Sequence, residues 1–396
     1  MKSIFLFLMI SGIFLSSLCA QQKLPYIDTV YDYRPAPGQF INKLPSYVTG
    51  DTKADMIRKV EECIVGEEQI LISLGGYGGY VVFGFDHLVV NVPGEYDFKI
   101  WGNAFYADVN PNPNAPAEGG SCEPGIVMVS YDANQNKIPD DEWYELAGSE
   151  YNKTETIKNY VLSYYKPDPD KIPTPHPSYL YLNDTSYIQW ISNQGDSGYI
   201  AKNRYHRQSY FPLWIEDDSL VFEGTKLADN YVDESGNGSL YILYAYPWGY
   251  ADNHPNNNEK SNMNIEWAVD ANGKKVNLPG IHFVKVYTGV NQYCGWLGET
   301  STEIMGAEDL HIDAELHIDQ EFPQDTKHII LIKNPVEHQL IISSSHNQMA
   351  EIYDYMGNKV LSFRLMNGMN HIDCNQLKNG IYILIAGNSR IKFYKQ

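Results

Sequence analysis

The sequence has few cysteines, and their spacing does not suit a metal site. Five occur in 396 residues, and no two of them form a C-x-x-C pair. The spacing that marks structural zinc sites and thiol redox centres is therefore missing. Cys19 lies in the first twenty residues. The remaining four, Cys63, Cys122, Cys294 and Cys374, allow three disulfide pairings, and a Cys122–Cys294 bridge is one that an exported protein could form.

Positive charge and long apolar runs are scarce as well. The formal net charge is −20, which argues against nucleic acid and anionic lipid as partners. After residue 20 no apolar stretch is long enough to span a bilayer, so we expect no transmembrane segment in the mature chain. The glycine cluster at residues 75–79 lacks the G-x-G-x-x-G spacing and a following helix. A phosphate-binding loop is therefore excluded there.

The first twenty residues have the pattern of a cleaved signal peptide. Lys2 supplies the basic end, residues 4–15 are apolar, and small residues precede Gln21. This order of basic, apolar and small residues is typical of export signals. We therefore expect residues 1–20 to be removed and the mature chain to be exported.

Short apolar runs dominate residues 71–317. They occur at 80–85, 88–92, 98–101, 126–129, 159–165, 179–200, 219–222, 240–246 and 282–287, and Gly, Pro, Asn and Asp separate them. Such punctuation is typical of consecutive antiparallel strands in a sandwich with long loops. Residues 21–70 precede this body as an extended segment and one helix. The helix is predicted over residues 51–65, where apolar side chains recur at helical spacing.

One loop after the 126–129 run has the residue types of a calcium-binding loop. Oxygen-bearing side chains alternate there, as in the first half of such loops. Lys137 replaces the usual Gly and Trp143 the usual Glu, so neighbouring acids would have to complete the ligand set. A polar hairpin turn would use the same residue types. The candidate Ca²⁺ ligands are Asp132, Asn134, Asn136, the carbonyl of Ile138, Asp140, Asp141 and Glu142.

Aromatic residues make up 13% of the chain, with 31 tyrosines. Rings beside Asp and Asn are typical of glycan sites, because rings stack on sugar faces and polar groups bond the hydroxyls. The segment at residues 246–253 has this character, and its candidate ligand-binding residues are Trp248, Tyr250, Asp252 and Asn253. A role in the core is the alternative, since Trp and Tyr also fill β-sandwiches.

No catalytic residue can be assigned. Ser197, in a G-D-S-G sequence, has no adjacent base, and the histidines lack zinc-binding spacing. Whether the chain is an enzyme stays open, and the missing parts favour a non-catalytic protein. The many acids of the body leave a glycan hydrolase with paired carboxylates as the alternative. An aromatic groove with two carboxylates about 5–9 Å apart would favour that alternative.

The composition changes near residue 326. Residues 21–326 carry 20 Lys/Arg and 45 Asp/Glu, whereas residues 327–396 carry eight and four. We therefore expect a linker at 318–326 and a separate domain at 327–396. That domain is predicted to be a small β-sandwich with a hairpin at residues 351–360 and a second strand pair at 370–384.

This C-terminal domain resembles the type A sorting domain of the Bacteroidota type IX secretion system. The matching positions include Asn334, Pro335, Gly357, Gly380 and Lys392. The resemblance implies that the signal peptide carries the chain across the inner membrane. The type IX machinery, a partner of the tail, would then carry it across the outer membrane. The chain is therefore expected to be secreted or held on the outer cell surface.

The body also resembles a known group. The segments G-N-A-F, E-P-G-I-V-M-V-S and G-W-L-G-E-T-S-T-E are similar to those of Bacteroidota cell surface proteins with a jelly-roll, galactose-binding-like body. The resemblance names no reaction, and some of these relatives accompany corrinoid-uptake genes. We expect a calcium-stabilised, non-catalytic surface protein that binds a glycan or another small ligand. A hydrolase, a corrinoid-uptake-associated protein and an adhesin-like module remain alternatives, and the ligand and oligomeric state stay open.

Overall fold

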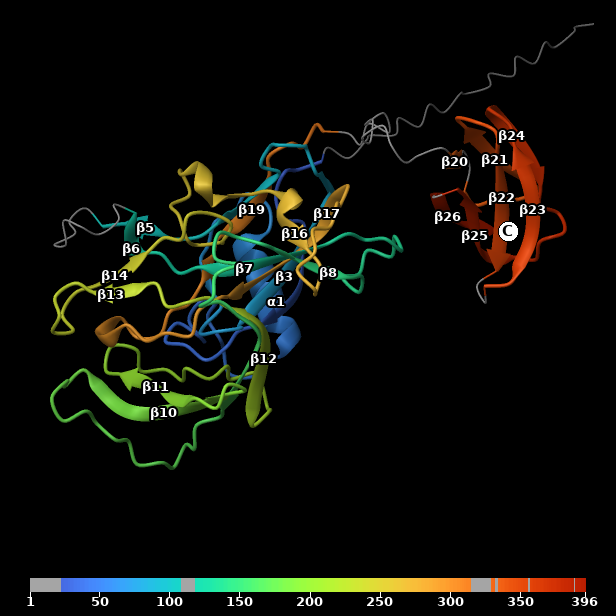
Figure 1. Cartoon of the computed structure of the whole chain (residues 1–396). Coiled ribbons are helices and arrows are strands. Elements are labelled where there is room, and N and C mark those ends of the chain that lie inside the picture. The colour runs from blue at the N-terminus through green and yellow to red at the C-terminus, as the bar shows by residue number, and fades with distance from the viewer. Residues whose placement is uncertain (1–22, 108–117, 315–328, 332–333, 355–356, 388) are drawn as a thin grey trace, which may run out of the picture. The chain divides into compact units, whose positions relative to one another are not determined.

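The computed structural model describes residues 23–107, 118–314, 329–331, 334–354, 357–387 and 389–396. The predicted signal peptide and linker lie outside these residues. The chain divides into two compact units, Met1–Leu316 and His317–Gln396, which are described separately (Figure 1). In the described part of the chain, no helix is both long and apolar enough to cross a membrane.

The body is built on a six-stranded antiparallel sheet with the order β1-β3-β17-β7-β8-β16. The bounds are Thr29–Arg34 for β1, Tyr80–Val90 for β3, Gly280–Thr288 for β17, Gly125–Ser130 for β7, Trp143–Leu146 for β8 and Ala268–Val269 for β16. The prediction of two strands at 80–85 and 88–92 is wrong, because both runs belong to β3. Asp86 and His87, which separate the two runs, do not form a turn. His87 is buried, and its Nε2 lies 2.9 Å from Asp309 Oδ2.

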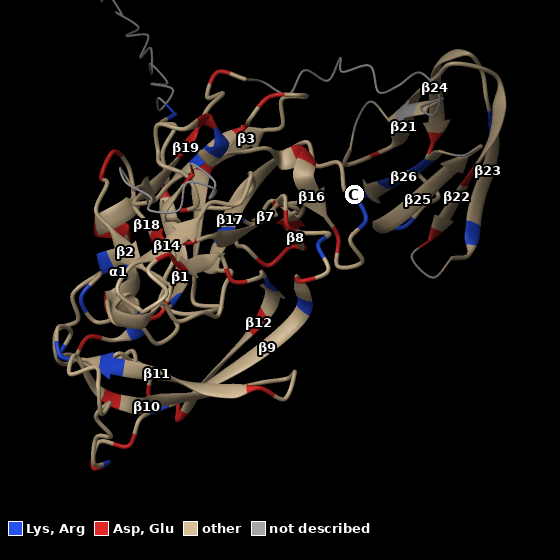
Figure 2. Ribbon diagram, turned by 60° about the vertical axis from the view of Figure 1, so that its left-hand side comes forward, with Lys and Arg blue, Asp and Glu red and all other residues tan. Residues whose placement is uncertain are grey.

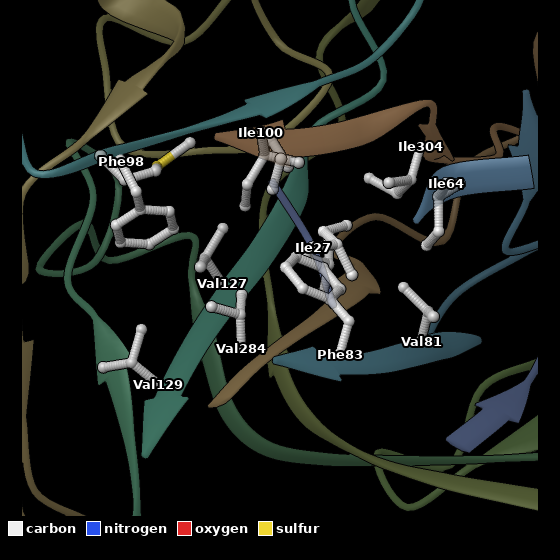
Figure 3. Close-up of a cluster of buried hydrophobic side chains, with 14 of the residues drawn as sticks. Ile27, Ile64, Val81, Phe83, Phe98, Ile100, Val127, Val129, Val284 and Ile304 are labelled. Atoms are coloured by element: carbon white, nitrogen blue, oxygen red, sulfur yellow. The ribbon is translucent and has the colours of Figure 1, made fainter. Parts of the chain in front are cut away.

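Both faces of the central strands are buried. In β7, Val127 and Val129 belong to one apolar cluster, while Ile126 and Met128 contact another. This alternation is the two-residue period of a strand. Figure 3 shows Val127 and Val129 in the first cluster, together with Phe98 of the neighbouring three-stranded sheet. The predicted all-β sandwich is thus confirmed, with a central sheet covered on two sides.

One helix and two sheets cover the central sheet. Helix α1, Lys53–Ile64, and the sheet β15-β4-β19 contribute to the first cluster, and the sheet β11-β10-β9-β12 contributes to the second. The bounds are Asn262–Met263 for β15, Phe98–Trp101 for β4, Gly306–Asp309 for β19, Ser197–Asn203 for β11, Leu182–Ser192 for β10, Ile157–Tyr165 for β9 and Ser219–Lys226 for β12. Thr52 and Asp55 form a capping box at the start of α1, as expected for the predicted helix.

Smaller elements complete the body. A four-stranded sheet has the order β13-β14-β6-β5, and β18 pairs with β2. The bounds are Tyr231–Asp233 for β13, Tyr241–Tyr244 for β14, Gly119–Ser121 for β6, Phe105–Tyr106 for β5, Glu303–Ile304 for β18 and Ile72–Ser73 for β2, with single 3₁₀ turns at Glu259–Ser261, Ile265–Trp267 and Gly295–Leu297. Figure 2 shows Asp and Glu on many separate elements of the body.

The C-terminal unit is a sandwich of two sheets, β20-β21-β24 and β23-β22-β25-β26. The bounds are Ile329–Leu331 for β20, Gln339–Ser344 for β21, Gln348–Asp354 for β22, Lys359–Leu365 for β23, Gly368–Asp373 for β24, Gly380–Ala386 for β25 and Ser389–Lys395 for β26. The predicted hairpin is β22–β23. The predicted pairing of the next two strands is wrong, because β24 pairs with β21 and β25 with β22. Cys374 and Leu377, between them, are buried in the core, so this segment joins the two sheets.

Candidate functional site

Three carboxylates from distant parts of the chain converge in the body. One oxygen each of Glu123, Asp252 and Glu303 lies within 4.8 Å of the others. Within the part of the chain that the structure describes, this is the one group of three or more His, Cys, Asp or Glu side chains with such spacing. Glu123 follows β6, Asp252 lies in the loop before β15, and Glu303 begins β18.

The backbone fixes the position of Asp252. Its Oδ1 accepts hydrogen bonds from the N–H groups of Asn103 and Ala104 at 2.8 and 2.9 Å, and its Oδ2 accepts one from the N–H of Glu303 at 2.9 Å. Asp252 itself has a φ of 53°, which is uncommon for a residue with a side chain. A Cβ atom at Gly102 would lie 2.4 Å from Asp252 Oδ1. The close approach therefore requires glycine at position 102.

The two glutamates are held less firmly. The Asn103 side-chain amide donates to Glu303 Oε2 at 2.9 Å. Glu123 accepts long hydrogen bonds from the Ser121 hydroxyl and the Ser301 N–H, both at 3.4 Å, and also forms a side-chain hydrogen bond with Glu303. Carboxylate oxygens with so few donors keep lone pairs for another group.

The electrostatics of the three carboxylates are unfavourable without a positive partner. Burial raises the pKa of Glu123 to about 7. Burial and the neighbouring charge of Glu123 raise the pKa values of Asp252 and Glu303 well above their usual range, and the backbone N–H groups oppose this at Asp252. Among the described residues, no Lys or Arg forms an ion pair with any of the three. Such a cluster can bind a cation or retain protons.

Two of the three carboxylates line a cavity of about 910 Å³, a size typical of small-molecule sites. Glu123, Glu303 and a further buried acid, Glu299, line it, and none of the described residues that line it is Lys or Arg. Burial raises the pKa of Glu299 to about 8. Rings line the same cavity, namely Phe40, Tyr179, Tyr181, Tyr205 and Trp296. We call this cavity the acidic pocket; it can offer ring faces and hydrogen-bond acceptors to one ligand.

The predicted binding loop at residues 246–253 contributes to this site through Asp252. Tyr250 is only 1% exposed, and its hydroxyl accepts from the N–H of Glu150, so its ring belongs to the core. The Asn253 amide exchanges two hydrogen bonds with the backbone of Tyr246. The ring of Trp248 lies 4.6 Å from that of Trp267 and does not line the acidic pocket. The structure therefore brings Asp252, but not the two rings, to the carboxylate cluster with Glu123 and Glu303.

The predicted calcium loop connects β7 to β8 and is closed by its own hydrogen bonds. Both carboxylate oxygens of Asp132 accept backbone N–H groups, and the amides of Asn134 and Asn136 donate to Asp140. The carboxylate of Asp141 accepts the N–H of residue 133, and the carbonyl of residue 138 accepts from residue 140. The Glu142 side chain instead accepts from the hydroxyl of residue 144. Most of the proposed ligands are thus gathered, and calcium binding stays a prediction.

Cys122 and Cys294 lie beside the acidic pocket. Both are buried in one cluster with Leu243, and both are free thiols in this structure. The structure therefore places this pair together without a disulfide between them.

Sequence reasoning missed Asn103, Glu123, Glu299 and Glu303. Asn103 and Glu123 each stand alone in their segments, and Glu299 and Glu303 share one segment with a spacing that matches no known site motif. A signal did exist: these residues lie in the three segments G-N-A-F, E-P-G-I-V-M-V-S and G-W-L-G-E-T-S-T-E, which carry the resemblance to surface proteins. In the structure these segments meet at the acidic pocket.

The sorting positions lie at defined places in the C-terminal unit. Asn334 Oδ1 accepts from the N–H of Tyr394 in β26, which ties the first residues of the domain to its last strand. Gly357, with a φ of 83°, lies between β22 and β23, and Gly380 begins β25. Pro335 follows Asn334, and the side chain of Lys392 in β26 is exposed.

Comparisons with known proteins identify this domain. Residues 334–396 match the family described as the secretion system C-terminal sorting domain. The chain therefore carries a type IX sorting tail and is exported, to the cell surface or to the medium. No curated protein matches the chain. A solved structure of a Faecalibacterium prausnitzii beta-glucuronidase aligns with 72% of this chain at 10% identity and a TM-score of 0.16, and the chain spans 47% of its length. That similarity is too low to carry an argument.

The hydrogen bonds of the carboxylates predict different effects of two conservative substitutions on the free energy of unfolding. Asp252→Asn would turn an amide donor toward backbone N–H groups, so we expect a loss of about 1–3 kcal/mol in the free energy of unfolding. Glu123→Gln breaks long contacts and removes a buried charge, so we expect no loss. Urea unfolding in the presence of a chelator measures both. Equal losses in the two variants would contradict the distinction.

Proposed function

We propose that this exported protein binds a small ligand, in the first place a glycan, in the acidic pocket and does not turn it over. The combination of ring faces with buried carboxylates in one cavity is the observation that carries the proposal. Rings stack on the C–H faces of sugars, and carboxylates accept hydrogen bonds from their hydroxyl groups. A cavity of about 910 Å³ is large enough for such a ligand.

A glycan hydrolase is the second candidate, because the pocket does contain neighbouring carboxylates. Glu123, with a pKa near 7, has the property of a general acid. The spacing argues against this function. Retaining enzymes hold their two carboxyl groups about 5–5.5 Å apart and inverting enzymes about 6.5–9.5 Å apart. Here three oxygens lie within 4.8 Å of one another, so they converge on one point instead of flanking a bond. This geometry favours binding.

We further propose that Ca²⁺ stabilises the body at the loop between β7 and β8. Asp132, Asn134, Asn136 and Asp140 already form one hydrogen-bonded group. Hard oxygen ligands from a short loop suit calcium. Gln135 and Lys137 adopt φ values of 60°, which gives the loop its tight curvature without glycine.

Substitution of one tryptophan in each candidate site tests whether the ligand binds in the acidic pocket or at the loop of residues 246–253. Trp296 is 44% exposed and lines the pocket, whereas Trp248 packs on Trp267 away from it. We expect Trp296→Ala to weaken ligand binding by about 1–3 kcal/mol, and the matched Trp248→Ala to leave it unchanged.

A glycan array and a corrinoid panel, screened with the mature chain, would first supply the ligand, and calorimetry would then measure both variants. The reverse order of effects would move the site to the Trp248 loop. Turnover of a glycan that is abolished by Glu123→Gln would replace binding by hydrolysis.

Calcium should raise the melting temperature of the intact chain through the loop. A ligand that binds only the folded state stabilises it by about 2.7 kcal/mol at a hundredfold excess over Kd. Asp132→Ala should lose part of this response, because Asp132 holds the backbone of the loop. Scanning calorimetry with calcium and with chelator tests this. An identical calcium response in the variant would leave the loop as a simple turn.

Deletion of residues 327–396 should leave the body folded but retain it in the periplasm. The body has its own apolar clusters, and the sorting tail is a separate unit. Fractionation and surface proteolysis in a bacterium with a type IX system would locate the truncated chain, with the intact chain as control. Normal surface levels of the truncated chain would overturn the assignment of the tail as the sorting signal.

A further inference from the structure

We infer that the floor of the acidic pocket is a calcium site formed by Glu123, Asp252 and Glu303, with Glu299 beside it. This site is distinct from the loop at Asp132. It shares a cavity with the proposed ligand site but does not depend on the identity of that ligand.

The first argument is convergence. Three carboxylate oxygens from three separate segments lie within 4.8 Å of one another, and like charges that close repel unless a cation or a shared proton lies between them. The protein positions them rather than letting them separate. Backbone N–H groups hold Asp252 on both of its oxygens, and the Asn103 amide directs Glu303 toward it. Glu123 is joined to the same point through its backbone N–H, which donates to the carbonyl of Asp252.

The second argument is an unsatisfied oxygen. Glu299 is 7% exposed and lines the same pocket. Its Oε1 accepts from the N–H of Gln39, but its buried Oε2 has no hydrogen-bond partner among the described residues. A buried carboxylate oxygen without a donor is rare, because burial removes it from water without compensation. A cation, or the water bound to one, would supply the missing partner.

The donor set selects the ion. The three converging carboxylates offer oxygen alone, which suits calcium and magnesium better than zinc. Calcium accepts six to eight oxygens in irregular arrangements, whereas magnesium requires a near-ideal octahedron. Cys294 also lines the pocket, but its sulfur is not among the ligand atoms that lie within 4.8 Å of one another.

Calcium binding by the mature chain is the test, with the Asp132→Ala variant used so that the loop does not contribute. We expect equilibrium dialysis to show one bound Ca²⁺ per chain. Adding Glu303→Gln should weaken that binding at least a hundredfold, and adding Glu216→Gln, at an acid that does not line the pocket, should not. No bound calcium in Asp132→Ala, unchanged binding in the Glu303→Gln variant, or preferential uptake of Zn²⁺ would overturn the inference.

A stability measurement separates an ion ligand from a purely structural residue. In the presence of a chelator, Glu303→Gln removes one of several crowded buried charges and keeps the oxygen that accepts from Asn103. We therefore expect it to raise the melting temperature in chelator and to lose the calcium-induced rise. A lower melting temperature in chelator would overturn the inference. Glu123→Gln, whose contacts are longer, serves if the first variant does not fold.

The test is independent of the proposed function. Loss of glycan binding in Trp296→Ala together with an absence of calcium would refute the ion site and leave ligand binding intact. Calcium binding in a chain that binds no glycan or corrinoid would refute the proposed ligand binding and leave the ion site intact.

Discussion

Burial of the central sheet on both faces is the constraint on which the rest of the body depends. Strands β3, β7 and β17 place apolar side chains in one cluster above and another below. A smaller cavity of about 380 Å³ remains over this sheet, lined by residues of β1, β3, β8 and β17. The larger acidic pocket lies in the loops and small sheets beside it, between β6, β11, β14 and β18.

Burying carboxylates next to this apolar core is energetically unfavourable. Removing even one ionised group from water is unfavourable by several kcal/mol when nothing compensates it. The body holds four acidic side chains near one another, at Glu123, Asp252, Glu299 and Glu303, and burial raises the pKa of each. Buried acids with raised pKa values are typical of functional sites, which supports the proposed ligand and ion sites. The same reasoning explains why Asp252 has a disfavoured backbone conformation and why residue 102 is glycine.

Structural features that depend on contacts between neighbouring residues could be predicted from the sequence, whereas features that depend on distant contacts could not. Helix α1 and strand β7 were predictable because a cap or an alternation lies within a few residues. The continuity of β3 as one strand was not predictable. Whether the chain turns or continues at Asp86 and His87 depends on a contact with the distant Asp309. In the C-terminal unit, the hairpin around Gly357 follows from local turn chemistry, but the crossing of the next segment follows from burial of Cys374 in the core.

The candidate site shows the same limit. Asp252 was predicted as a site residue, yet for a loop whose ring at Tyr250 fills the core instead. The glutamates could not be found by spacing, since their partners lie up to 180 residues away in the chain. The segments quoted for the resemblance to surface proteins contain all of these glutamates, but the resemblance does not explain why the glutamates occur there. The structure explains it, because the segments meet in space.

The strand order also has a kinetic consequence. Strand β17 lies between β3 and β7, although it begins 150 residues after β7 ends and 190 residues after β3 ends. Until residues 280–288 have been synthesised, β3 and β7 each have one edge of backbone N–H and C=O groups without its partner strand. Contacts between segments so far apart in the sequence form slowly. The body therefore completes its central sheet only after residues 280–288 have been added, late in its synthesis.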